Sequence, residues 1–445
     1  MMREAIGDAI RNHAAEVFVL LNLLMFPLWP IILIATWVSF GSISIDLNLA
    51  RYVVSLISLG LIAAIKPRRS AMAIVFVIVL IIVGMQFLFD LQTAKFLTSS
   101  DFITLWITLL AFMLIIGLPD IFDPPQFNER WIRHATRLAI IVALIGFLEW
   151  GLLSNECLAS LGYYRLLNIA KGLPMTSTLS GPLPANIYSF IRGFHYRRMV
   201  SIVGEPLYLS YYLYPFVILF IIIIVDRLTL FNIICFLIVT AAMCLALSRQ
   251  IILVTLLTAI FYLILNQRTR KITIKLSRFL LLPAVPALIF GVKFLWARDA
   301  SFKGHLIFFI DSLRRIGWGG LLFPDEHTLV GNMLALKYGA RFTTESAVLE
   351  ILSITGLPLF ILLISTSLRT LVRDLRTSVD IAHSKEEKYN TIARSLVIAW
   401  PFALLGELLT TFFSPQILTL QISFYLIGWS LAFHAARASL KKCTS

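Results

Sequence analysis

Apolar runs of about 20 residues recur along almost the whole chain, and they restrict the possible folds more than any other feature. A helix of roughly 20 apolar residues is needed to cross a hydrocarbon core of about 30 Å. Hydrophobic residues make up 59% of the 445 residues, and charged residues only 14%. Because lipid offers no partners to backbone polar groups, such runs predict a bundle of membrane-spanning helices.

The runs predict an all-α polytopic membrane protein in which residues 1–445 form a single integral membrane domain. For residues 1–16, which precede the first run, an interfacial helix and an unordered polar start are both open interpretations. We expect twelve spans, near residues 17–39, 47–65, 71–91, 101–118, 135–154, 206–225, 230–248, 250–266, 279–297, 346–368, 394–413 and 416–436.

The basic residues orient these spans, because cytoplasmic loops carry an excess of Lys and Arg. The alternate short connections hold little beyond Lys95 and Arg249. Both termini are therefore expected in the cytoplasm. Much of the net charge of +14 reflects topology, so we expect no nucleic-acid partner. The basic segments are 66–69, 130–137, 268–278, 369–394 and 437–442.

Two connections on the outer, periplasmic side are too long to be simple connectors, namely residues 155–205 and 298–345. Structureless loops of more than about 15 residues are uncommon and usually functional. Both loops carry basic side chains that can contact an anionic substrate. The candidates are Arg192, His195 and Arg198 in the first loop, and His305, Arg314, Arg315, His327 and Arg341 in the second.

Two short motifs stand where polar segments meet apolar runs. In Gly204-Glu205-Pro206 the proline suits a first helical turn, and Glu205 lies at the positive end of the helix dipole. This carboxylate is either a cap or part of a site. In Ser248-Arg249 an arginine occupies a tight turn close to the hydrocarbon, where an ionisable residue is a candidate functional group.

The sequence lacks the motifs of nucleotide-driven pumps and of metal-dependent sugar transfer. It has no Walker loop, no GxGxxG, no Asp-x-Asp pair in an outer loop and no zinc-ligand spacing. We therefore expect no cofactor and no metal. A phosphate-bearing lipid would have to be neutralised by arginine, whose planar fork donates two hydrogen bonds and keeps its charge.

Taken together, these features resemble the O-antigen polymerase and ligase superfamily of bacterial inner membranes. The shared features are about twelve spans, two long periplasmic loops, the Gly204-Glu205-Pro206 re-entry and the Ser248-Arg249 turn. Tyr208, two residues after the proline, makes the motif more similar to the polymerase branch, whereas Leu207 departs from the small or polar residue often found there. The resemblance implies a fold similar to the C-type membrane glycosyltransferases, which are all-helical and metal-independent.

The resemblance also implies a function in lipopolysaccharide biosynthesis. The expected activity is polymerisation of undecaprenyl-pyrophosphate-linked O-antigen repeat units at the periplasmic face of the inner membrane. The implied partners are these lipid-linked oligosaccharides, membrane lipids and a chain-length regulator. Glu205, His305 and His327 are the candidate catalytic groups, one of which would take the acceptor proton. The candidate ligands of pyrophosphate or sugar are Arg249, Arg192, His195, Arg198, Arg314, Arg315 and Arg341.

Other functions stay open at this point. An O-antigen ligase would use the same donor and transfer it to lipid A core. A lipid-linked oligosaccharide flippase would favour two similar halves and charge along a central cavity, neither of which is visible in the sequence. Another membrane glycosyltransferase is a further alternative, and a scaffolding protein would leave Arg249 without a role.

Overall fold

The computed structural model describes residues 2–40, 43–65, 123–162, 187–191, 194–266, 347–383, 391–410 and 420–444, with Ile115, Leu118, Ile121, Leu183 and Ile310 as single positions. The described part is mostly helical, as the sequence predicts. Three of its helices are long and apolar enough to cross a membrane, or four if one bent pair counts as a span. The predicted spans 71–91 and 279–297 lie outside the described residues, as does most of 101–118.

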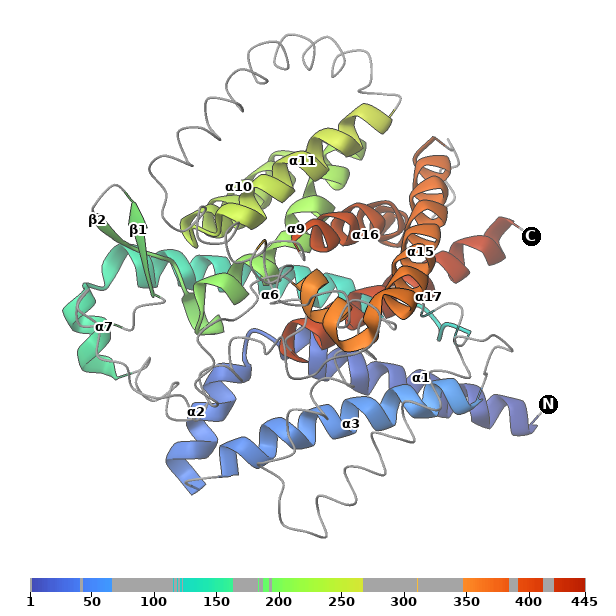
Figure 1. Cartoon of the computed structure of the whole chain (residues 1–445), viewed down its shortest axis with the longest axis horizontal. Coiled ribbons are helices and arrows are strands. Elements are labelled where there is room, and N and C mark those ends of the chain that lie inside the picture. Colours follow the sequence, from blue (N-terminus) through green and yellow to red (C-terminus); the bar gives the residue numbers. More distant parts are fainter. Residues whose placement is uncertain are drawn as a thin grey trace.

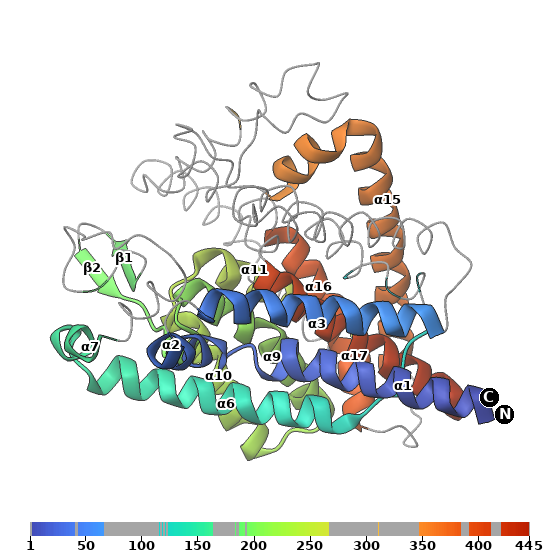
Figure 2. The ribbon, with the colours of Figure 1, turned by 90° about the horizontal axis from the view of Figure 1, so that it is seen from below.

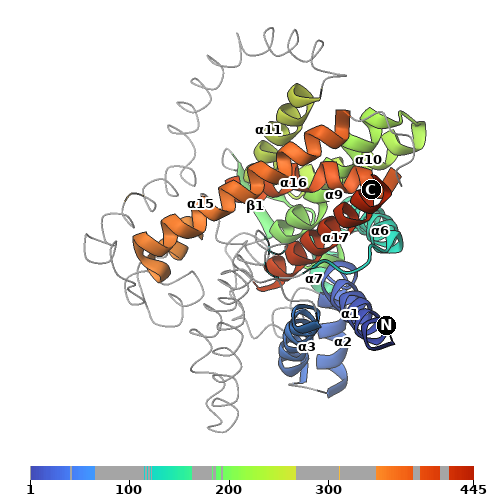
Figure 3. The same cartoon turned by 90° about the vertical axis from the view of Figure 1, so that its right-hand side faces the viewer.

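The N-terminal region forms a layer of three helices, α1 (Met2–Val19), α2 (Trp29–Phe40) and α3 (Ile43–Ile65), with the π-helical turn η1 (Leu20–Leu24) after α1. The apolar run 17–39 is not one straight helix, because its two halves are bent by 88°. Pro27 lies in the break and supplies no backbone N–H to continue a helix. Figure 3 shows these helices grouped at one side of the others.

The middle of the chain contains most of the elements that position the candidate site. The helices α6 (Glu129–Leu152) and α7 (Asn155–Leu161) lead to a hairpin of β1 (Tyr188–Ile191) and β2 (Phe194–Arg197), which pair in antiparallel register. The 3-10 turn η3 (Ser201–Val203) then precedes three helices, α9 (Pro206–Asp226), α10 (Leu230–Leu245) and α11 (Arg249–Leu265).

Helix α9 is the centre of the bundle. It is buried along most of its length and contacts α6, α10, α11, α16 (Thr391–Thr410) and α17 (Leu420–Thr444). Figure 1 shows α9 among these helices. Tyr211, Tyr212 and Tyr214 are among the largest fully buried side chains of the described part. Two further helices close the fold, α15 (Ala347–His383) and α17 (Leu420–Thr444). The two termini lie at the same end of the molecule (Figures 1 and 2).

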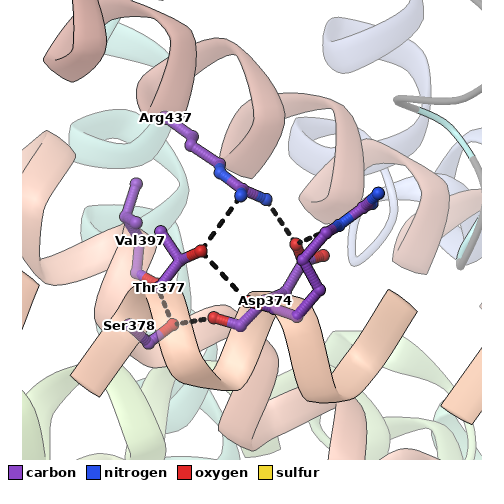
Figure 4. A network of polar contacts seen from close by, with 6 residues as sticks. Asp374, Thr377, Ser378, Val397 and Arg437 are labelled. Atoms are coloured by element: carbon purple, nitrogen blue, oxygen red, sulfur yellow. Dashed lines mark hydrogen bonds and ion pairs between the residues drawn. The ribbon is translucent and has the colours of Figure 1, made fainter. Parts of the chain in front are cut away.

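Helix α15 continues well past the predicted span end at residue 368, and its polar extension is anchored to α17 (Figure 4). Arg437 donates to the Asp374 carboxylate and to the Thr377 hydroxyl, the latter at 3.0 Å. One turn away, the Ser378 hydroxyl donates to the Val397 carbonyl of α16 at 2.8 Å. Burial raises the pKa of the Asp374 carboxyl, and the charges of Arg437 and Arg373 act against that rise.

Candidate functional site

The two sequence motifs lie in segments that are hydrogen-bonded to each other. We call residues 198–205 the re-entry segment and residues 246–248 the α10–α11 turn. The Met199 backbone N–H donates to the Leu245 carbonyl at 3.0 Å, and Arg198 Nε donates to the Ala246 carbonyl at 2.8 Å. The start of α9, the end of α10 and the start of α11 therefore lie at the same end of the bundle.

Both segments contain residues with an unusual backbone. The φ angle is 56° at Ser201, 81° at Gly204 and 52° at Leu247. Positive φ is ordinary for glycine but uncommon for other residues, where it carries a strain of about 1–3 kcal/mol. Because such strain persists only where surrounding contacts enforce it, Ser201 and Leu247 point to a segment with a functional or packing constraint.

Contacts with α6 hold the re-entry segment in this conformation. The Ser201 backbone N–H donates to Glu149 Oε2 at 3.0 Å, and its hydroxyl donates to the Val142 carbonyl at 2.7 Å. A Cβ atom at Gly146 would lie 2.8 Å from Met199 Sδ and 3.2 Å from Ser201 Cβ, so the glycine leaves room for these two side chains. Glu149 and Ser201 were not candidates from the sequence, where Glu149 is simply one acid near the end of an apolar run.

Glu205 is the N-cap residue of α9, with φ −151° and ψ 133°, and Pro206 takes the first helical position as the sequence predicts. The Glu205 carbonyl accepts from the Leu209 N–H at 3.0 Å. Its half-buried side chain makes no capping hydrogen bond. The structure therefore does not support the interpretation of the Glu205 carboxylate as a helix cap.

The arginines at the end of the first long loop differ in what they contact. Arg197, the last residue of the hairpin, donates from Nη1 to the Leu153 carbonyl at 2.6 Å and from Nη2 to the carbonyls of Glu149 and Trp150. These carbonyls end α6, so Arg197 acts as its C-terminal cap. Arg198 instead fixes the α10–α11 turn through Nε. Its predicted contact with substrate stays a prediction.

The remaining candidates are described in part or not at all. The backbone of Arg249 begins α11, and the backbone of His195 pairs with Phe190 in the hairpin, but neither side chain is among the described atoms. Six predicted site residues lie outside the described residues, namely Arg192, His305, Arg314, Arg315, His327 and Arg341. Their roles stay predictions.

A layer of buried polar groups lies deeper in the bundle, beneath the re-entry segment. The Tyr214 hydroxyl donates to Thr258 Oγ1 and the Tyr211 hydroxyl donates to Thr410 Oγ1, both at 3.2 Å. The Glu407 side chain is 0% exposed, and neither of its oxygens has a hydrogen-bond partner among the described residues. Its neighbour Gly406 touches Tyr214, which is eight residues past Pro206, or about 12 Å along α9.

Within the described ranges no group of three or more His, Cys, Asp or Glu side chains is arranged to hold a metal ion. No family model matches the chain, and searches of the curated proteins and of the solved structures find no match either. The fold therefore defines the class of the protein only coarsely, as a helical protein with several apolar helices that can span a membrane.

Proposed function

We propose that the protein is a membrane glycosyltransferase that polymerises undecaprenyl-pyrophosphate-linked O-antigen repeat units at the periplasmic face of the bacterial inner membrane. The observation that carries this proposal is the pairing of the re-entry segment with the α10–α11 turn. It brings the segment that ends in Glu205 beside the turn that leads into Arg249. A glutamate and an arginine whose backbones lie at one end of an apolar bundle suit the transfer of a sugar from a lipid diphosphate.

In this reaction the acceptor hydroxyl oxygen attacks the anomeric carbon of the donor chain. The bond between that carbon and the pyrophosphate oxygen breaks, and the electron pair leaves with the undecaprenyl pyrophosphate. Arg249 neutralises the negative charge that develops on the leaving group. Glu205 takes the proton of the acceptor hydroxyl, a role for which His305 and His327 are the alternative groups.

The absence of a capping bond at Glu205 supports its part in this scheme. An N-cap side chain usually accepts from the second or third backbone N–H of its helix, and such a bond would occupy the carboxylate. In α9 the Glu205 side chain makes no such bond, although Leu207 and Tyr208 both carry a backbone N–H. The carboxylate is thus available to a proton or to an arginine.

A strain that lacks this protein provides the test. Its lipopolysaccharide should carry a single repeat unit on the core, and a plasmid copy should restore the ladder of longer chains. Core without any repeat unit would instead indicate a ligase or a flippase. Unchanged long chains would rule out all three functions.

A further inference from the structure

Arg51 is a buried arginine that the proposed reaction does not use. Its side chain is 2% exposed in α3, and neither Nε nor the two Nη atoms have a hydrogen-bond partner among the described residues. The guanidinium keeps its charge in proteins and carries five N–H donors. Burying a charged group without partners is strongly unfavourable, so this arrangement indicates an anion that the described part of the chain does not provide.

Two aromatic rings hold the guanidinium in place without using its donors. Its central carbon lies 4.6 Å from the centroid of the Trp29 ring and 5.7 Å from that of the Tyr52 ring. Such contacts engage the faces of the rings, whereas the N–H groups lie in the plane of the fork. The fork is therefore oriented but its hydrogen-bonding capacity is unfilled.

Near Arg51 in the fold, the buried side chain of Asn22 also has a polar atom without a hydrogen-bond partner among the described residues. Asn22, in the π-helical turn η1, donates to the Phe18 carbonyl at 3.0 Å and to Ser55 Oγ at 2.7 Å, while its Oδ1 has no partner among the described residues. The Ser55 hydroxyl donates to the Arg51 backbone carbonyl at 2.8 Å, so Asn22 contacts a residue that lies one helical turn from Arg51. Single π-helical turns inside helices occur frequently at functional sites.

This cluster lies beside the candidate site. Trp29 begins α2 directly after the 88° bend, and α2 contacts η3, the turn that leads to Gly204 and Glu205. In the predicted topology Arg51 is four residues inside the outer end of its span, about 6 Å at 1.5 Å per residue. Lipid phosphates are the anionic groups found near this depth, and Trp is enriched at the same level.

We propose that Arg51, held against Trp29, binds the phosphate of a lipid headgroup. The planar fork matches two phosphate oxygens, and the unpaired Asn22 Oδ1 can accept from a hydroxyl on the same headgroup. The choice of a lipid diphosphate as the ligand rests on the proposed function. A polymerase must hold two lipid diphosphates at once, and Arg249 is proposed to bind the first. Arg51 then binds the second.

The test measures binding of lipids to purified full-length protein in detergent by native mass spectrometry. The probes are undecaprenyl diphosphate, phosphatidylglycerol and undecaprenol, the last having the same tail as the first but no phosphate. Wild-type protein should bind at least one phosphate-bearing probe at least tenfold more tightly than undecaprenol. Preference for the diphosphate identifies the carrier lipid, and equal binding of both phosphate probes identifies a general phospholipid site.

Arg51→Lys keeps the charge but loses the fork, so it should weaken binding of the preferred probe at least tenfold. Trp29→Leu should weaken it severalfold. Arg133→Gln is the matched control, because Arg133 is an exposed arginine paired with Glu129 on α6 and should bind as wild type does. If Arg51→Lys accumulates poorly, Trp29→Leu and the wild-type comparison with undecaprenol decide the question.

Wild-type binding that does not distinguish the phosphate lipids from undecaprenol overturns the proposal, as does unchanged binding in Arg51→Lys. The lipid-binding measurement does not depend on whether the protein transfers sugars. A strain without the protein that still makes long chains would remove the polymerase function, while loss of binding in Arg51→Lys would keep the phosphate site.

Discussion

At the scale of single residues, Glu205 shows how a short motif depends on contacts made elsewhere. Its backbone starts α9, but its position is set by Gly204, by the strained Ser201 and by the bonds from Ser201 to α6. Replacing Glu205 by Gln keeps size and hydrogen bonding and removes the charge. Since the side chain makes no capping bond, the free energy of unfolding should fall by less than about 1 kcal/mol.

We therefore expect Glu205→Gln to reach the membrane in normal amount and to lose long O-antigen chains. Immunoblots of membranes and lipopolysaccharide gels provide the two measurements. Wild-type banding at normal abundance would return Glu205 to a purely structural role.

Arg249 allows a sharper comparison, because two substitutions separate charge from geometry. Arg249→Lys retains one positive charge but not the bidentate fork, and Arg249→Ala retains neither. If preorganised electrostatics at the leaving pyrophosphate dominate, the alanine variant should lose several kcal/mol of transition-state stabilisation, roughly 10²–10³ in rate. The lysine variant should also lose polymer.

Membrane abundance measured beside chain length distinguishes this from a structural role for Arg249. A salt bridge within the protein would make Arg249→Ala misfold and disappear from the membrane. Normal abundance with full-length polymer in Arg249→Ala would show that Arg249 does not stabilise the leaving pyrophosphate.

The sequence predicted two backbone features of the candidate site that depend on local chemistry. Pro206 at the first helical position follows from its missing N–H, and the tight turn before Arg249 follows from the end of one apolar run and the start of the next. Glu149, Ser201 and Arg51 could not be identified in this way. Their significance lies in partners, or in the lack of partners, that only the folded chain brings about.

At the scale of secondary-structure elements, the apolar runs located α3, α6, α9, α10, α11 and α16 within a few residues. The bend in 17–39 was missed because hydropathy does not register a proline such as Pro27. The hairpin of β1 and β2 was missed because its aromatic strands were read as part of a long loop. Helix α15 is longer than its apolar run because α17 anchors its polar end.

Among the glycines whose surroundings the structure describes, Gly406 of α16 has the least room for a side chain. A Cβ atom there would overlap with Tyr214 Oη and lie 2.7 Å from a methyl carbon of Val254, so side chains of α9 and α11 would both have to move. Gly406→Ala should destabilise the bundle by about 1–3 kcal/mol or more, as overpacking does. Lower membrane abundance and a lower melting temperature in detergent are the expected observations.

Gly60→Ala in α3 is the matched control, because a Cβ atom there meets nothing within 4 Å. It should be neutral or stabilise the protein by up to about 1 kcal/mol through helix propensity. Tyr214→Phe removes the oxygen nearest to the new methyl group and should partly rescue Gly406→Ala. If Gly406→Ala and Gly60→Ala behave alike, the close contact between α9 and α16 is wrong.

At the scale of the whole molecule, the distribution of basic residues predicts which face of the membrane each connection occupies. Single cysteines introduced at Ser180 and Asp325 should react with an impermeant thiol reagent from the periplasm. Cysteines at Lys271 and Lys385 should react only after the inner membrane is opened. The control is the chain with its four native cysteines replaced. Labelling of positions 180 and 271 from the same side would overturn the twelve-span topology.

The cap that Arg197 places on α6 has a consequence for how the chain is synthesised. The last carbonyls of α6 obtain their donors from a residue that follows them by 44 to 48 positions. At 5–20 residues per second, that interval lasts on the order of seconds. During this time α6 has left the ribosome with an unfinished end, so a pause in translation or export within this interval would expose that end to quality-control proteases.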